Sequence, residues 1–181
     1  NAVIAGADFE DTTVQGFTAQ QLYSTASYQA QDLHGVNLED NDLTGWNFAG
    51  QNLSGADIQE AVLTDADLNR ANLSGGNLRG TTAIRANFQA ADLDKVTFAP
   101  SVVDETGSPA YSNLTQANLS QARLNNVDSS SATLTGAHLT DTDLCGAYLR
   151  DVLDLQSTAY SPSTFYNQWT MFPPDFDPVA A

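Results

Sequence analysis

The sequence predicts a repeat solenoid, a fold in which the chain turns a corner every five residues. A large apolar residue recurs at every fifth position, and 23 of 26 such central positions hold Leu, Ile, Val or Phe. Many central residues follow an Asp or Asn, which itself often follows a small residue. A period of five matches neither the 3.6 of a helix nor the 2 of a strand. We therefore expect each unit to supply one short side and one turn, with two side chains inward.

The positions of glycine support the predicted corners. Corners often need a positive φ, which Gly adopts at little steric cost. Ten of the 12 glycines lie two residues after a central residue. These ten are Gly6, Gly16, Gly35, Gly45, Gly50, Gly55, Gly75, Gly80, Gly136 and Gly146.

The repeats fall into three blocks within one continuous domain. The first block has central residues Ile4, Phe9, Val14 and Ala19. Ala83 and Ser129 are the irregular central residues of the other two blocks. We expect a first repeat coil (1–21), a short helical insert (22–30), a main repeat block (31–98), a loop insert (99–111), a second repeat block (112–154) and a C-terminal cap (155–181).

The repeats Ala66-Asp67-Leu68-Asn69-Arg70 and Ala71-Asn72-Leu73-Ser74-Gly75 resemble those of the pentapeptide-repeat family. The resemblance implies an all-β fold, a right-handed quadrilateral β-helix with four pentads in each coil, so that residues 20 apart stack on one face. It leaves the function open, because one fold serves many functions.

Two further phrases are similar to large pentapeptide-repeat proteins of planctomycete type: residues 22–30 with 45–53, and the closing segment 166–181. This similarity implies an exported protein, at the cell surface or outside the cell. The chain opens with Asn1 instead of Met, and we expect a processed or excised piece of a longer protein.

The helical insert and the loop insert each have two interpretations. Thr18 and Gln21 have the spacing of a capping box, which predicts the start of a short helix. That helix is either a structural cap or a docking element for a partner. The loop insert contains Pro100, Gly107 and Pro109. It is either a tolerated insertion or a functional loop.

The C-terminal cap carries six of the chain's 16 aromatic residues. We expect this segment to fold over the last coil and close its core. The alternative is a dimer interface, because aromatic residues also dominate interfaces, so the chain is either a monomer or a C-terminal-mediated dimer. The six residues are Tyr160, Phe165, Tyr166, Trp169, Phe172 and Phe176.

The composition excludes several classes of function. The chain has 22 Asp and Glu against 6 Lys and Arg, a net charge of −16, which excludes direct binding of nucleic acid. No apolar run is long enough to insert in a membrane. Cys145, the single Cys, cannot form an intramolecular disulfide. We expect no enzymatic activity, no metal and no cofactor, because catalytic and metal-binding motifs are missing and His34 and His138 lie far apart in outward positions.

Much of the acidity has a predicted structural use. Stacking by 20 places Asp32, Asn52, Asn72 and Asp92 in one outward column, so that Asp alternates with Asn and the amides can bond along it. A denser group remains, which we call the acidic patch. It consists of Glu39, Asp40, Asp42, Asp57, Glu60 and Asp65.

These features predict a non-enzymatic solenoid that presents a rigid acidic surface to an unidentified protein partner. The alternative is a DNA mimic that binds a type II topoisomerase, as the quinolone-resistance group of the family does. A rod about 31 Å long would carry one net charge per ~2 Å, which is close to the ~1.7 Å of DNA. A third interpretation is a carbohydrate-active or Ca²⁺-dependent surface protein with the cation at the acidic patch.

Overall fold

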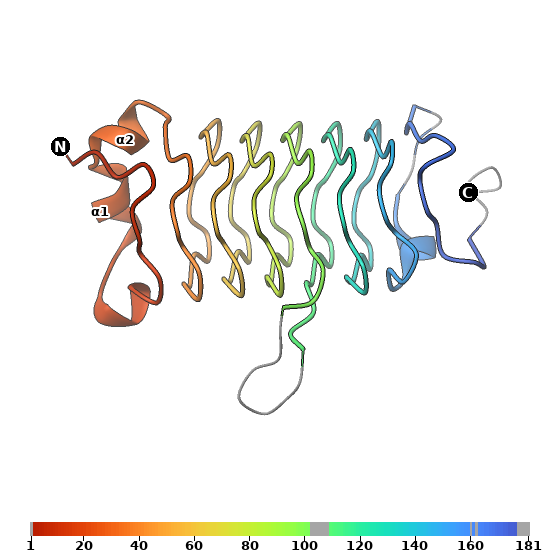
Figure 1. The fold of residues 1–181 in the computed structure, drawn as a ribbon, viewed down its shortest axis with the longest axis horizontal. Helices are drawn as coiled ribbons and strands as arrows, with labels where there is room; N and C mark the ends of the chain where they lie inside the picture. The colour runs from red at the N-terminus through yellow and green to blue at the C-terminus, as the bar shows by residue number, and fades with distance from the viewer. Residues whose placement is uncertain (1, 102–108, 160, 162, 177–181) are drawn as a thin grey trace.

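The computed structural model is a rod of stacked coils, with the first and last described residues at opposite ends (Figure 1). It describes residues 2–101, 109–159, 161 and 163–176. Parallel bridges join residues 20 positions apart, as in Asp32–Asn52, Asn52–Asn72 and Asn72–Asp92. Each coil of the main block makes four such bridges, one on each side, which confirms the predicted stacking by 20. Within these described residues the bridges are isolated pairs, because a side of five residues turns before a longer strand can form.

The central residues fill the interior of the rod. Leu68 is fully buried and lies between the coils that carry Phe48 and Phe88. Ala83 and Ser129, which interrupt the apolar row, are buried as well, so the coil keeps its register at both. Small residues two positions before the central ones are also buried, and their size leaves room for the Leu and Phe side chains.

The corners have the backbone conformation that the glycine positions predict. All ten glycines at corner positions have positive φ, for example Gly55 at 65°. The N–H of Ala56 donates to the carbonyl of Leu53 at 3.0 Å and closes the turn around Gly55. Non-glycine residues adopt the same conformation at other corners, including Asp40 and Glu60, with φ of 58° and 56°.

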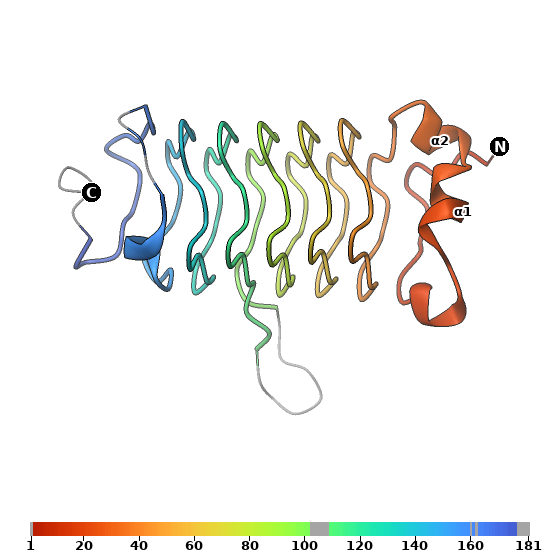
Figure 2. The ribbon, with the colours of Figure 1, turned by 180° about the vertical axis from the view of Figure 1, so that it is seen from behind.

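The loop insert leaves the rod between two intact coils (Figure 2). Thr82 pairs with Asn113, 31 residues further on, so 11 additional residues separate coils that remain neighbours. The N–H of Ser101 donates to the carbonyl of Ala110 at 2.9 Å and closes the base of the loop. Gly107 lies outside the described residues.

The described residues form four short helices at the ends of the rod: η1 (Thr13–Gln15), α1 (Ala19–Tyr23), α2 (Ala26–Gln29) and η2 (Leu155–Ser157). The predicted capping box is present, because Thr18 accepts from the N–H of Gln21 and the Gln21 side chain accepts from the N–H of Thr18. This cap starts α1 at Ala19, three residues before the expected insert. Among the described residues, no helix has the length and apolarity needed to cross a bilayer.

The predicted inward position of Val14 is wrong. Val14 lies in η1 and is 76% exposed, and Ala19 begins α1 instead of a side of the coil. The Asn41 side chain explains the departure, because its Oδ1 accepts from the N–H of Thr13 at 2.8 Å and holds η1 outside the core. Ile4 and Phe9 do lie against the core, so the first coil is only partly formed.

The N-terminal edge of the first full coil is closed on every side. The N–H groups of Asp32 and Asn37 donate to the carbonyls of Ser27 and Ala7 at 2.8 and 3.0 Å. The N–H of Asp42 donates to Thr13 Oγ1 at 3.0 Å. On the fourth side, the N–H of Asn47 donates to the Tyr23 hydroxyl at 2.6 Å, and the Tyr28 hydroxyl donates to the carbonyl of Asn47 at 2.8 Å. Side chains here replace a neighbouring strand.

The C-terminal coil contains more residues than the regular coils of 20. His138 pairs with Ala159, Asp143 with Phe165 and Tyr148 with Met171, so the offset grows from 21 to 22 and then to 23 residues. The regular period of five therefore ends before the last coil.

Candidate interaction surface

The residues that precede the central ones have two structural roles. Their side-chain oxygens accept from the backbone N–H two residues later, as in Asp67 to Asn69 at 3.0 Å and Asp57 to Gln59 at 3.1 Å. Amides also donate along the columns, as from Asn87 Nδ2 to Asp67 Oδ1 at 3.0 Å. The bonding along the columns was predicted, whereas the local turn was not, although the Asp or Asn at a constant place in the repeat could have indicated it.

Stacked carboxylates form a separate group at one corner of the rod. The N–H of Asp11 donates to the carbonyl of Glu39, and the N–H of Asp40 donates to that of Gln59, so Asp11, Asp40 and Glu60 occupy one corner in successive coils. The adjoining side contributes three more carboxylates. We call these six residues the acidic ridge: Glu10, Asp11, Glu39, Asp40, Asp57 and Glu60.

The acidic ridge and the acidic patch share four residues. Two residues of the patch are absent from the ridge, and the ridge has two that the patch lacks. The structure brings Glu39, Asp40, Asp57 and Glu60 of the patch together. Asp42 lies on the next side of the coil, in the column of Val62. Asp65 lies at another corner, where Arg85 donates to both of its oxygens at 2.7 and 2.6 Å.

The sequence analysis missed Glu10 and Asp11. The first coil is offset by 29 residues instead of 20, as the Asp8–Asn37 bridge shows, because the helices are inserted between them. No periodicity of five could place these two residues beside Glu39 and Asp40. An excess of acids in residues 8–11 was the one available indication.

Two carboxyl groups of the ridge, those of Glu39 and Asp40, have raised pKa values. Partial burial raises the pKa of Glu39, and the charges of Asp57, Glu10, Asp40 and Glu60 raise it further. Partial burial also raises the pKa of Asp40, with additional contributions from Glu60 and Asp11. The Gln59 amide donates to Glu39 Oε1 at 2.8 Å, but among the described residues no Lys or Arg forms an ion pair with these carboxyl groups.

The charge of the rod is strongly uneven along its length. Eleven of the 22 acidic residues, and no Lys or Arg, lie in residues 1–69. All six basic residues follow, and Arg85 and Arg123 pair with Asp65 and Asp92. The acidic ridge therefore lies in the part of the chain that has no Lys or Arg.

The C-terminal aromatic residues occupy two kinds of position. Phe172 and Phe176 are partly buried against the core and lie 5.2 Å apart by ring centroids. Phe165 and Trp169 are 61% and 69% exposed. Tyr166 is also exposed, although its ring contacts Phe172 edge-on at 5.3 Å. Tyr160 lies outside the described residues.

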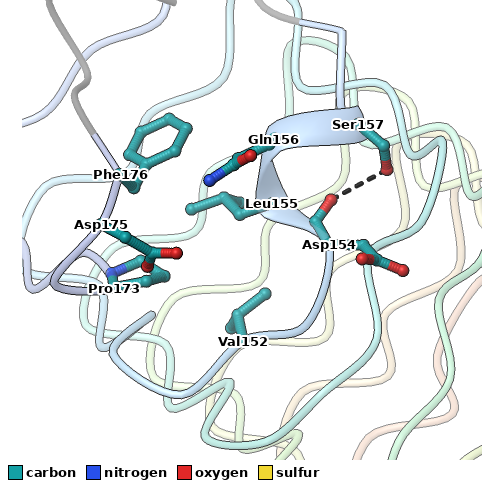
Figure 3. A pocket seen from close by; sticks show the side chains of 8 residues that line it. All are labelled: Val152, Asp154, Leu155, Gln156, Ser157, Pro173, Asp175 and Phe176. Carbon is teal, nitrogen blue, oxygen red and sulfur yellow. Dashed lines mark hydrogen bonds between the residues drawn. The ribbon is translucent and has the colours of Figure 1, made fainter.

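A cavity of about 470 Å³ lies between η2 and the terminal segment (Figure 3). Its wall includes Val152, Pro173 and the ring of Phe176. The Asp154 carboxylate at its rim accepts from Thr135 Oγ1 at 2.7 Å, so it is already engaged. Beside the two acids, the described part of the lining contains no His, Lys or Cys.

The other side chains of chemical interest are those that could bind a metal ion or act as a nucleophile. In the part of the chain that the structure describes, no group of three or more His, Cys, Asp or Glu could hold a metal ion, which does not favour Ca²⁺ binding at the acidic patch. The adjacent Asp143 carboxylate raises the pKa of the Cys145 thiol, and partial burial adds to this, so the reactive thiolate is disfavoured.

The coils and the acidic ridge define a class of protein, a repeat solenoid with a charged lateral surface. The chain belongs to the pentapeptide-repeat family, whose model matches eight copies over residues 32–70, 61–98 and 112–151. No curated protein matches the sequence.

Several solved pentapeptide-repeat structures are similar to this chain. Rfr23 from the cyanobacterium Cyanothece 51142 is 23% identical over 73% of this chain and 85% of its own, with a TM-score of 0.32. HetL from Nostoc sp. strain PCC 7120, a protein involved in heterocyst differentiation regulation, is 22% identical over 80% and 79%, with a TM-score of 0.29. Full-length QnrB1, a plasmid-mediated fluoroquinolone resistance protein, is 16% identical over 92% of both chains, with a TM-score of 0.28.

Proposed function

We propose that this chain is a non-enzymatic interaction module that presents a rigid acidic surface to a protein partner. Family membership and the four-sided coils support a right-handed quadrilateral β-helix as its scaffold. The acidic ridge carries the functional proposal, because it places six neighbouring carboxyl groups on a fixed backbone, and no Lys or Arg forms an ion pair with them in the described part of the chain. Such a surface attracts a positively charged partner and repels nucleic acid and anionic membranes.

A titration with a fluorescent decalysine peptide tests this proposal. We expect Glu39→Gln/Asp40→Asn/Glu60→Gln to weaken binding at least about threefold at low salt, because the local potential falls. The matched control is Asp128→Asn/Asp143→Asn/Asp151→Asn, which removes the same charge elsewhere and should weaken binding less. Equal losses in both variants would assign the attraction to net charge and remove the ridge as a site.

The second candidate is a DNA mimic that binds a type II topoisomerase. The net charge of −16 on a narrow rod favours it, whereas the concentration of uncompensated charge in residues 1–69 departs from the even charge of DNA. A gyrase supercoiling assay separates the candidates. Absence of inhibition at tens of micromolar protein would reject the mimic, and a dimer with strong, salt-sensitive gyrase binding would favour the mimic over an unidentified partner.

We also propose that the C-terminal coil joins two copies of the chain. One support is the exposure of the Phe165 and Trp169 side chains. A second is the open edge of this coil, where no described residue accepts a hydrogen bond from the backbone N–H of Tyr166 or Phe172. The N-terminal edge is closed, so pairing through the open edge would stop at a dimer.

Sedimentation analysis tests the dimer. We expect the parent chain to sediment as a species of twice the monomer mass at a protein concentration of about 100 µM. The variant Phe165→Ser/Trp169→Ser should sediment as a monomer, because the interface loses its large apolar anchors. Val3→Ser, at the other end of the rod, should leave the dimer intact. A monomeric parent chain at that concentration would contradict the proposal.

A further inference from the structure

Val14 is a large apolar residue that the fold leaves outside the core. It lies on one wall of a shallow groove of about 400 Å³ near the N-terminal end of the rod. The apolar part of the lining comes from Val14, Phe17, Ala19 and Trp46. The groove is further lined by Thr13, Thr18 and Asp42.

The walls of this groove are fixed by contacts to the first full coil. Phe17 stacks on Phe9 at 4.8 Å between ring centroids and contacts Trp46 at 5.7 Å. Thr13 accepts from the N–H of Asp42, and its own N–H donates to Asn41 Oδ1. The capping box at Thr18 holds the start of α1. The groove is therefore preformed, and a ligand need not order it.

The groove adjoins the acidic ridge. Asp11 precedes Thr13 by two residues, and Asp40 precedes Asp42 by two residues. Two residues span at most ~7 Å of backbone, so both chain segments pass from the ridge to the groove within that distance. Asp42 contributes a carboxylate to the groove itself, and hydrogen bonds from Thr44 lower its pKa, so it is ionised at neutral pH.

We propose that the groove and the acidic ridge together bind a basic protein segment through one large apolar side chain. The apolar side chain lies against Val14, Phe17 and Trp46, and neighbouring Lys or Arg side chains of the partner face the ridge. Charge complementarity selects this occupant, because residues 1–69 have no Lys or Arg and an acidic segment would be repelled. The inference rests on the proposed function and specifies the chemistry of its partner.

Two labelled peptides test the pairing of an apolar anchor with basic flanks. Both have ten lysines, and they carry either Leu or Ser at the centre. We expect the Leu peptide to bind the intact chain about fivefold more tightly, since burial of an apolar side chain adds to the electrostatic attraction. A higher salt concentration should weaken the binding of both peptides and leave the ratio of their affinities nearly unchanged.

Matched variants assign the preference to the groove. Val14→Asn should bring the Leu peptide to the affinity of the Ser peptide. Val3→Asn changes a similarly exposed Val outside the groove and should retain the fivefold ratio. Circular dichroism of both variants verifies the fold. We expect Val14→Asn to remain folded, because the Val14 side chain is exposed to solvent.

Each outcome separates the inference from the proposed function. Equal binding of the Leu and Ser peptides to the parent chain, or equal loss in the two Val variants, overturns the groove and leaves the ridge proposal standing. Failure of every lysine peptide to bind overturns both proposals. A retained ratio in Val14→Asn shows that the anchor lies elsewhere and overturns the groove.

Discussion

Leu68→Ala should destabilise the protein by about 3 kcal/mol, within the range of about 2–5 kcal/mol found for such changes in packed cores. Leu68 is fully buried, and its coil lies between those of Phe48 and Phe88. Truncation would leave a cavity between two rings that the bonded coils cannot close, because the bridges above and below fix the spacing. Urea denaturation of both proteins measures the difference.

Leu153→Ala is the matched control for this prediction. Leu153 takes part in a bridge to Thr133, but its side chain is 57% exposed. The same substitution there should cost less than about 1 kcal/mol. In a solenoid each coil depends mainly on its neighbours, so hydrogen exchange in Leu68→Ala should increase most in the adjacent coils. Equal costs for the two substitutions would contradict the assignment of Leu68 to the core.

Glu39→Gln/Asp40→Asn should stabilise the protein at pH 7 by about 1 kcal/mol, because it removes like charges stacked between coils. This figure allows for screening by solvent, which reaches both side chains. The pKa values of Glu39 and Asp40 are raised in the folded state, so folding favours their protonated forms. The folded parent chain should therefore gain stability as the pH falls from 7 toward the ordinary Glu pKa of about 4.3.

The double variant should lose most of the gain in stability at lower pH, and calorimetric melting between pH 4.5 and 8 measures this difference. At still lower pH the stability of the parent chain should fall. Hydrogen bonds from Arg85 lower the pKa of Asp65, so its contribution is present at neutral pH and is lost on protonation. Asp65→Asn is the control of opposite sign and should lower the melting temperature at pH 7. An unchanged pH profile in the double variant would show that the ridge charges do not oppose folding.

The repeat could be predicted because it is local. A corner every five residues places Leu68 inward, Gly55 at positive φ and Asp67 where its carboxylate meets the N–H of Asn69. Each of these roles depends on residues within one unit or one coil. The same logic predicted the capping box at Thr18, since a helix cap is a contact between residues three apart.

The interaction surface could be predicted only in part. Glu39, Asp40, Asp57 and Glu60 follow from stacking by 20. Glu10 and Asp11 do not, because the inserted helices change the offset to 29.

The sequence by itself determined the coil, its inward and outward positions and the excess of negative charge, because these depend on a short period repeated many times. The tertiary structure decided which carboxylates stack, that Val14 leaves the core, and that tyrosine hydroxyls close one end of the rod while aromatic rings remain exposed at the other. The physical reason is the same in each case. Insertions and chain ends interrupt the period, and there the contacts are made between residues whose separation no repeat specifies.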